Sequence, residues 1–149
     1  MEIAVLALGC FWGPEKKFGE LEGIVKTEVG YCGGKMSNTT YKEVCTGETE
    51  HAEVVKLFFD PKKISYEQII DCFFEFHDPT TLNRQGPDIG TQYRSEIFYS
   101  NEQQKNISLS KIEELNKKFG SKITTKVSEI KNYTKAEDYH QKYLEKNSF

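Results

Sequence analysis

Residues 3–8 (IAVLAL) form a continuous apolar run that ends at Gly9, and a polar, helix-prone segment begins shortly afterwards, near Pro14. A short, uninterrupted apolar run bounded by glycine is typical of a strand that is buried on both faces. Proline is common in the first turn of a helix, where its missing N–H group is not needed. The chain is therefore predicted to begin with a buried strand, a tight turn and a helix.

The rest of the chain continues to alternate strands and helices. Further strands are predicted at residues 24–31, 52–60, 96–99 and 122–129, and further helices after Ser65, from Asn101 to about Phe119, and from Thr134, with Glu137 completing its capping pair. This order favours an α+β fold, a two-layer sandwich of a mixed β-sheet and packed helices with a ferredoxin-like core. The 149 residues contain no repeat and no linker, so we expect one catalytic domain over residues 1–149.

Two connections, residues 31–51 and 78–95, are long and rich in turn-forming residues. Loops of this length without regular structure are uncommon in a compact domain and are often functional. We expect both loops to meet at the turn after the first strand.

Composition excludes several classes of function. The net charge is −3, the charges are interspersed, and no apolar stretch approaches the roughly 20 residues that span a bilayer. No basic stripe suggests nucleic acid. The chain starts Met1-Glu2, has no lysine before Lys16, and its apolar run is short for a secretory signal. We therefore expect a cytoplasmic protein that binds neither nucleic acid nor membrane, with monomer as the default state.

The four cysteines lack the spacing of a metal site. None form a C-x-x-C pair, and the three histidines show no zinc-like pairing with them. A disulfide framework is not expected in a reducing compartment. The sequence thus predicts no metal and no cofactor, and Cys72, on the apolar side of a helix, is interpreted as inert core.

Cys10 has the sequence context of a nucleophile. It precedes a helix N-terminus, where the helix dipole and free N–H groups favour a thiolate and lower its pKa. Gly9 and Gly13 allow a tight turn, and Phe11 and Trp12 place apolar surfaces beside the sulfur. The alternative is a buried cysteine at the end of a strand, with Trp12 anchoring the core.

Two further stretches contain candidate polar residues. Glu53 begins a strand that should be buried, and burial would raise its pKa toward that of a general acid; the alternative is an exposed residue on an edge strand. In "RQGPDIGTQYRS", the chain's two arginines, Arg84 and Arg94, bracket Asp88 and Tyr93. The arginines suit either salt bridges that hold the loop or direct substrate contact.

These stretches together resemble the A class of peptide methionine sulfoxide reductases, which act on the S epimer at sulfur. The matching segments are "GCFWG", "GYCGG", "TYKEVCTGETEHAEVV", "DPKKISYEQIIDCFFEFHDPT", "RQGPDIGTQYRS" and "AEDYHQKYL", in the family's order over residues 4–144.

The resemblance implies a role for each candidate residue. Cys10 would attack the sulfoxide sulfur and become a sulfenic acid, while Glu53 would protonate the sulfoxide oxygen. Tyr41 and Tyr93 would hold that oxygen, and Asp88 would support the network. Phe11 and Trp12 would enclose the substrate's S-methyl group. The substrate would be methionine-S-sulfoxide, free or in oxidised proteins.

The sequence departs from the family's pattern at the C-terminus. Many members continue into a tail that carries resolving cysteines, and such a tail is not expected here. Three routes of recycling stay open: Cys32 or Cys45 reaches Cys10, a small thiol such as glutathione attacks, or thioredoxin does. We favour an external thiol or glutaredoxin.

Two other functions stay open, a module that binds methionine sulfoxide without turnover, and a cysteine hydrolase with His51 or His140 as base.

Overall fold

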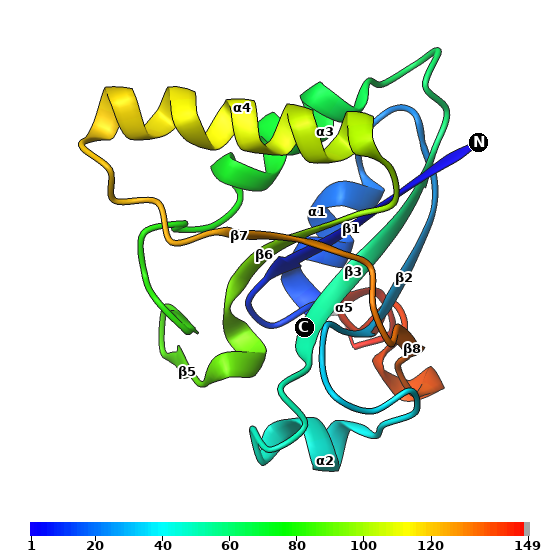
Figure 1. The fold of residues 1–149 in the computed structure, drawn as a ribbon. Coiled ribbons are helices and arrows are strands. Elements are labelled where there is room, and N and C mark those ends of the chain that lie inside the picture. The colour runs from blue at the N-terminus through cyan, green and yellow to red at the C-terminus, as the bar shows by residue number, and fades with distance from the viewer. Residues whose placement is uncertain (148–149) are drawn as a thin grey trace.

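The computed structural model describes residues 1–147 and shows a six-stranded sheet in the order β7-β6-β1-β3-β2-β8, with a separate two-stranded hairpin β4-β5 (Figure 1). The strands are β1 (Glu2–Leu8), β2 (Ile24–Cys32), β3 (Ala52–Phe59), β4 (Arg84–Gln85), β5 (Asp88–Ile89), β6 (Ser95–Tyr99), β7 (Lys126–Glu129) and β8 (Thr134–Lys135). Pairing is antiparallel except between β6 and β7, which are parallel, so the sheet is mixed as predicted.

Five α-helices accompany the sheet in the described residues: α1 (Trp12–Gly19), α2 (Tyr41–Cys45), α3 (Tyr66–Glu75), α4 (Glu102–Phe119) and α5 (Tyr143–Lys146). Ser65 and Gln68 form the predicted capping box of α3, and Asn101 caps α4 through the Gln104 N–H group. The order β1-α1-β2-β3-α3-β6, with β6-β1-β3-β2 side by side, is a ferredoxin-like core. The predicted α+β fold class is therefore confirmed.

The two faces of the sheet bury different clusters. Alternate side chains of β1 point to opposite faces, so Leu6 and Leu8 join the larger cluster, together with α1 and α3, whereas Val5 and Ala7 join the smaller one. Ile130 and Tyr133, from the segment after β7, pack against the smaller cluster. We call the side with the larger cluster the near face and the other the far face.

The helix predicted from Thr134 is wrong. Thr134 instead pairs with Tyr31 as part of β8, and the Glu137 carboxylate accepts hydrogen bonds from the Tyr31 hydroxyl and the Tyr41 N–H group. The chain forms only the 3₁₀-helix Asp138–His140 and the short α5. Long-range contacts of the side chains therefore override the local capping pattern.

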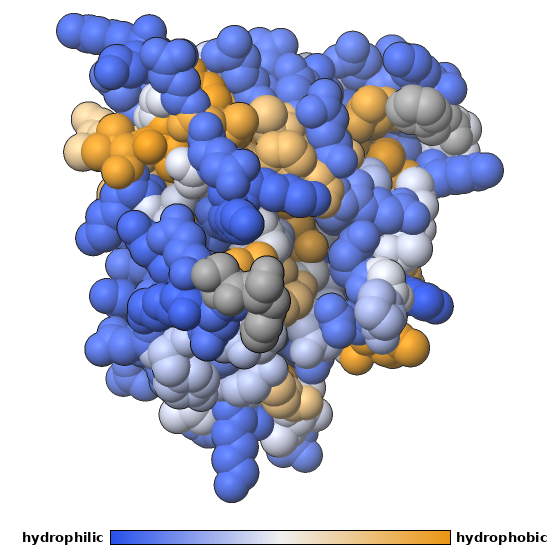
Figure 2. All heavy atoms as spheres, turned by 180° about the vertical axis from the view of Figure 1, so that it is seen from behind, coloured by the Kyte–Doolittle hydropathy of each residue, from blue (hydrophilic) through white to orange (hydrophobic). Residues whose placement is uncertain are grey.

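The side of the molecule shown in Figure 2 is mostly hydrophilic, with apolar residues in separate groups. Within residues 1–147, no helix combines the length and hydropathy needed to cross a membrane.

Candidate active site

Cys10 lies in the turn between β1 and α1, next to the hairpin β4-β5. Gly9, with φ +94°, makes this turn, and a Cβ atom added there would come within 2.8 Å of the Gln85 Cβ atom. Only glycine suits this close approach. The loop of residues 78–95 therefore packs directly against the turn that carries Cys10, as predicted.

Glu53 is buried in β3, with only 1% of its surface exposed. Its Oε1 atom accepts the backbone N–H of Phe11 at 3.2 Å, whereas its Oε2 atom is buried and has no hydrogen-bond partner among the described residues. Burial raises the pKa of Glu53 to about 8, the Phe11 hydrogen bond opposes the shift, and the charge of Asp88 adds to it. Glu53 is thus a neutral carboxylic acid at pH 7, and the alternative of an exposed edge residue is excluded.

The Cys10 thiol differs from the prediction in its ionisation. Burial raises its pKa to about 12; a hydrogen bond from the Trp12 backbone lowers it, and the charges of Glu53 and Asp88 raise it. The N-terminal N–H groups of α1 do act as expected, but desolvation outweighs them. In the absence of a ligand, Cys10 is therefore a neutral thiol beside a neutral acid.

Tyr41 and Tyr93 come from the two long loops and lie in the same electrostatic environment. Burial raises the pKa of Tyr93 to about 12, and the nearby Glu53, Cys45, Asp88 and Cys10 add to this shift. The pKa of Tyr41 is raised by burial, then by a hydrogen bond with Cys45, and also by Glu53 and Tyr93. Both hydroxyl groups therefore keep their protons at neutral pH and can donate.

Phe11 and Trp12 form an aromatic wall next to Cys10. Phe11 is buried against Tyr31, with ring centroids 5.7 Å apart. Trp12 is half-buried and stacks on Tyr143 of α5, with centroids 3.8 Å apart and planes 9° from parallel. Five of the residues predicted for the site therefore lie within electrostatic reach of one another, namely Cys10, Glu53, Asp88, Tyr41 and Tyr93, and Phe11 and Trp12 directly follow Cys10 in the chain.

The arginines of this region have structural contacts. Arg94 forms a buried ion pair with Glu96, at 2.6 Å from Nε to Oε1, and donates to the Thr91 carbonyl. Arg84 is exposed and donates to the Gly86 carbonyl. Both arginines therefore hold the loop, which is the first of the two roles considered.

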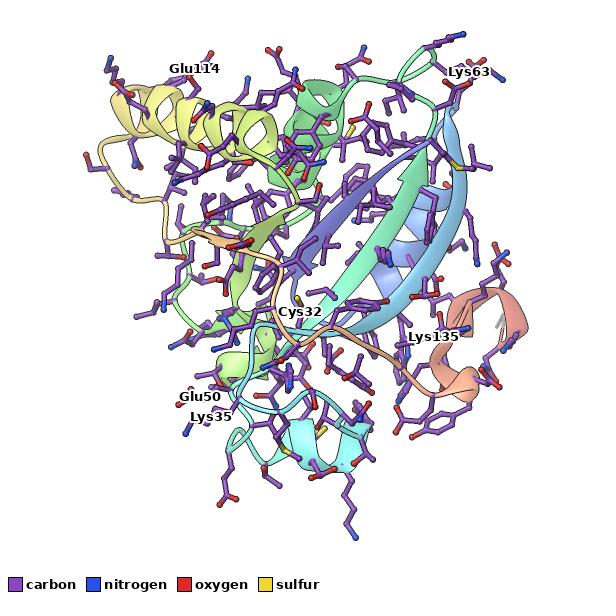
Figure 3. All side chains as sticks on the ribbon, turned by 45° about the vertical axis from the view of Figure 1, so that its right-hand side comes forward. Cys32, Lys35, Glu50, Lys63, Glu114 and Lys135 are labelled. Atoms are coloured by element: carbon purple, nitrogen blue, oxygen red, sulfur yellow. The ribbon has the colours of Figure 1, made fainter. Side chains whose placement is uncertain are left out.

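The other three cysteines have distinct locations. Cys32 belongs to the far-face cluster, is completely buried, and donates to the Lys131 carbonyl at 3.4 Å (Figure 3). Cys72 is half-buried on α3 and packs against the near-face core, as predicted. Cys45 is exposed at the end of α2, and its side chain is close enough to Tyr41 and Cys10 to affect their pKa values. Cys45 is thus the described thiol that shares the environment of Cys10.

Sequence reasoning missed the residues that support the site from the C-terminal segment. Glu137 binds Tyr31 and the backbone of Tyr41, and His140 accepts the indole N–H of Trp12 at 3.1 Å. Only their place in the motif "AEDYHQKYL" could have marked them.

His51, the other histidine considered as a base, instead accepts the Gly34 N–H group and bonds the Met36 carbonyl. In residues 1–147, no three metal-ligating side chains gather into a site for an ion.

Comparison with known proteins identifies the family. The family model described as "Peptide methionine sulfoxide reductase" matches residues 2–149. A peptide methionine sulfoxide reductase MsrA from Pelagibacter ubique is 67% identical over 146 residues, covering 98% of this chain and 99% of that protein. The crystal structure of Mxr1 from Saccharomyces cerevisiae in reduced form has a TM-score of 0.93 and 43% identity, and the match covers 98% of this chain and 85% of that one.

A further structure is that of Mxr1 from Saccharomyces cerevisiae in complex with Trx2. It has a TM-score of 0.68 and 29% identity, with 95% of this chain and 84% of that chain covered. The family match and the identities over nearly the whole length agree with the motifs around Cys10 and Glu53. This chain belongs to the peptide methionine sulfoxide reductase family.

Proposed function

We propose that this reductase converts methionine-S-sulfoxide, free or in oxidised proteins, to methionine, with Cys10 as nucleophile and Glu53 as general acid. The observation that carries the assignment is the unpartnered, buried oxygen of a neutral Glu53 beside Cys10. A buried polar atom without a partner is costly, so its persistence favours a role in chemistry.

The protein groups that react in the first step are the Cys10 thiol and the Glu53 carboxylic acid. The Cys10 sulfur attacks the sulfoxide sulfur while Glu53 transfers its proton to the sulfoxide oxygen. A bond forms between the two sulfurs, and the sulfur–oxygen bond of the substrate breaks as the oxygen, protonated by Glu53 and by the Cys10 thiol, leaves as water. Water then attacks the Cys10 sulfur, the bond between the sulfurs breaks, and methionine leaves with that electron pair, so that Cys10 becomes a sulfenic acid. The proton that the attacking water releases returns to Glu53, so in sum thiol and sulfoxide become sulfenic acid and methionine.

The remaining site residues bind and orient the sulfoxide. Tyr41 and Tyr93 donate to its oxygen, on which negative charge grows as the sulfur is attacked, and Asp88 supports this polar group. Phe11 and Trp12 contact the S-methyl group. The protonated hydroxyl groups of both tyrosines and the aromatic wall around Trp12 support these assignments.

Cys10 is then recycled by an external thiol. A thiolate of the reductant attacks the sulfenic sulfur, water leaves, and a second thiolate releases Cys10 from the mixed disulfide. The complex of the related Mxr1 with Trx2 supports thioredoxin as reductant, and glutaredoxin or glutathione fits the same chemistry. Cys32 is an unsuitable internal partner because it is buried on the far face.

We infer that residues 1–149 act as one catalytic domain, since residues from Cys10 to Tyr143 contribute to a single site. Four free cysteines favour a reducing compartment such as the cytoplasm.

The test is a mass and thiol measurement after treatment with excess methionine sulfoxide and no reductant. The proposal predicts one oxygen added at Cys10 and one thiol lost per sulfoxide reduced. An unchanged mass would indicate a binding module, and an acyl adduct formed from an ester substrate would indicate a hydrolase. Two lost thiols, with Cys10 bridged to Cys45 on peptide mapping, would contradict recycling by an external thiol alone.

A further inference from the structure

The hairpin β4-β5 carries Asp88 and is too short to hold its own position. Its strands pair Arg84 with Ile89 and Gln85 with Asp88. A two-stranded hairpin is at best marginally stable in water, so its place in the molecule is set by what it contacts. The position of Asp88 therefore depends on the contacts that hold the hairpin beside Cys10.

The two faces of the hairpin differ in exposure. Residues directly opposite each other on antiparallel strands point to the same face, and successive residues point to opposite faces. Arg84 and Ile89 are both exposed, so their pair lies on the outer face. Gln85 and Asp88 are both partly buried, so their pair lies on the inner face. The Asp88 side chain therefore points to the same side as that of Gln85, toward the turn that carries Cys10.

The Gln85 side chain ties this inner face to two other parts of the molecule. Its Oε1 atom accepts the backbone N–H of Asp78 at 2.9 Å, and its Nε2 atom donates to the Asp78 carbonyl at 2.8 Å. Its aliphatic part lies on the Cys10 turn, since a Cβ atom added at Gly9 would come within 2.8 Å of the Gln85 Cβ atom and 2.9 Å of its Cγ atom. One side chain thus joins the hairpin, the Cys10 turn and the start of the loop of residues 78–95.

The charge of Asp88 acts on the reacting groups of the site. Burial is the main cause of the raised pKa values of Cys10, Glu53 and Tyr93, and the charge of Asp88 adds to all three. A Coulomb interaction weakens with distance, so this effect requires that Asp88 be held close. The other titratable groups that interact with Glu53 stay neutral while it titrates, because burial raises their own pKa values: Cys10, Tyr31, Tyr41 and Tyr93.

We propose that Gln85 is a positioning residue of the reductase, which holds the Asp88 carboxylate beside Cys10 and Glu53. The assignment rests on the proposed function of Cys10 and Glu53. Without the two amide hydrogen bonds, the hairpin is free to move off the Cys10 turn and to carry Asp88 with it. The polar group that binds the sulfoxide oxygen then loses its support, and the single-turnover rate should fall about 3- to 10-fold, the scale of one neutral hydrogen bond.

The test compares Gln85→Met with the matched control Gln104→Met. Methionine keeps the length and packing of the side chain but bonds neither backbone group of Asp78. Gln104 of α4 also bridges two backbone groups, since its amide accepts from the Ser100 N–H at 2.9 Å and donates to the Ile3 carbonyl at 2.7 Å. These bonds lie at the opposite end of β1 from the active site, so the control loses comparable bonds without touching the hairpin.

Two quantities are measured, the single-turnover rate and the infrared titration of the Glu53 carboxylic acid. We expect Gln85→Met to lower the rate and to lower the apparent pKa of Glu53 by about 0.5 unit, because a negative charge has moved away. Gln104→Met should leave both quantities near the wild-type values. Asp88→Asn should lower both, and adding Gln85→Met to Asp88→Asn should change neither further, because Gln85 acts through Asp88.

An unchanged Glu53 titration or an unchanged rate in Gln85→Met would overturn the proposal. Equal shifts with and without the Asp88 carboxylate would also overturn it, because Gln85 would then affect the site by another route. The titration needs no turnover. A titration shift that depends on Asp88, in a chain whose wild type reduces no sulfoxide, would therefore support the placement of Asp88 and reject the proposed function.

Discussion

Each face of the sheet has a cysteine near a buried carboxylate, Cys32 near Glu96 and Cys10 near Glu53, but the two pairs differ in how their polar atoms are satisfied. On the far face, Glu96 accepts from Arg94 Nε and Ser128 Oγ, both at 2.6 Å, and Cys32 donates to a backbone carbonyl. On the near face, one oxygen of Glu53 accepts from Phe11 and the other has no partner among residues 1–147.

This difference separates a structural pair from a reactive one. A buried carboxylate with both oxygens bonded, such as Glu96, is held in one position by its partners. A buried carboxyl group such as that of Glu53, with one oxygen that lacks a hydrogen-bond partner among the described residues, keeps its proton and can give it to a ligand. The access of solvent and ligands to the two thiols also differs, because Cys32 is completely buried whereas Cys10 is half-buried where the two long loops meet.

The largest expected effect comes from the cysteines themselves. Cys10→Ser should abolish sulfoxide reduction, because a serine hydroxyl is a far weaker nucleophile and cannot form the sulfenic acid. Cys32→Ser and Cys72→Ser should retain nearly full activity per folded molecule in a coupled assay with thioredoxin. Complete loss on changing Cys72 would show that its assignment to packing is wrong.

The two carboxylates should respond differently to the same substitution. Glu53→Gln keeps the acceptor for the Phe11 N–H group but has no proton to give, so the single-turnover rate should fall about 10²- to 10⁴-fold while sulfoxide binding survives. Glu96→Gln should leave that rate within a few-fold and instead lower stability, since Arg94 loses its charged partner. A Glu53→Gln variant that reduces sulfoxide at the parental rate would exclude the general-acid role.

A smaller effect should appear in the pH dependence of stability. The pKa of Glu53 is raised from 4.5 to about 8 by folding, so the folded state binds the extra proton and loses stability as pH rises through this window. Removing the carboxylate removes that loss. Relative to wild type, the free energy of unfolding of Glu53→Gln should rise by about 4 kcal/mol from pH 4.5 to pH 8.

Urea unfolding at several pH values measures this quantity. Glu96→Gln is the control, and it should be less stable than wild type at neutral pH because its partner Arg94 stays buried. A constant stability difference between Glu53→Gln and wild type over pH 4.5–8 would mean that folding does not raise the pKa of Glu53.

Much of the fold was predictable, because residues 3–8 and the capping residues Ser65 and Asn101 specify their elements locally. The segment after Thr134 was not, since its structure depends on contacts with Val29, Tyr31 and Trp12, far away in the sequence. Cys10 and Glu53 were identifiable from their context and motifs. The neutral state of Cys10 was not, because desolvation depends on how closely both loops pack over the turn.

The central claim is that Glu53 is a protonated acid at neutral pH, and infrared spectroscopy measures this directly. Difference spectra recorded over a pH titration report the carbonyl band of a protonated carboxylic acid. We expect a band that disappears with an apparent pKa near 8 in the wild type and in Glu96→Gln, and that is absent at pH 7 in Glu53→Gln. Loss of the wild-type band near pH 4.5, the ordinary value for glutamate, would contradict the account.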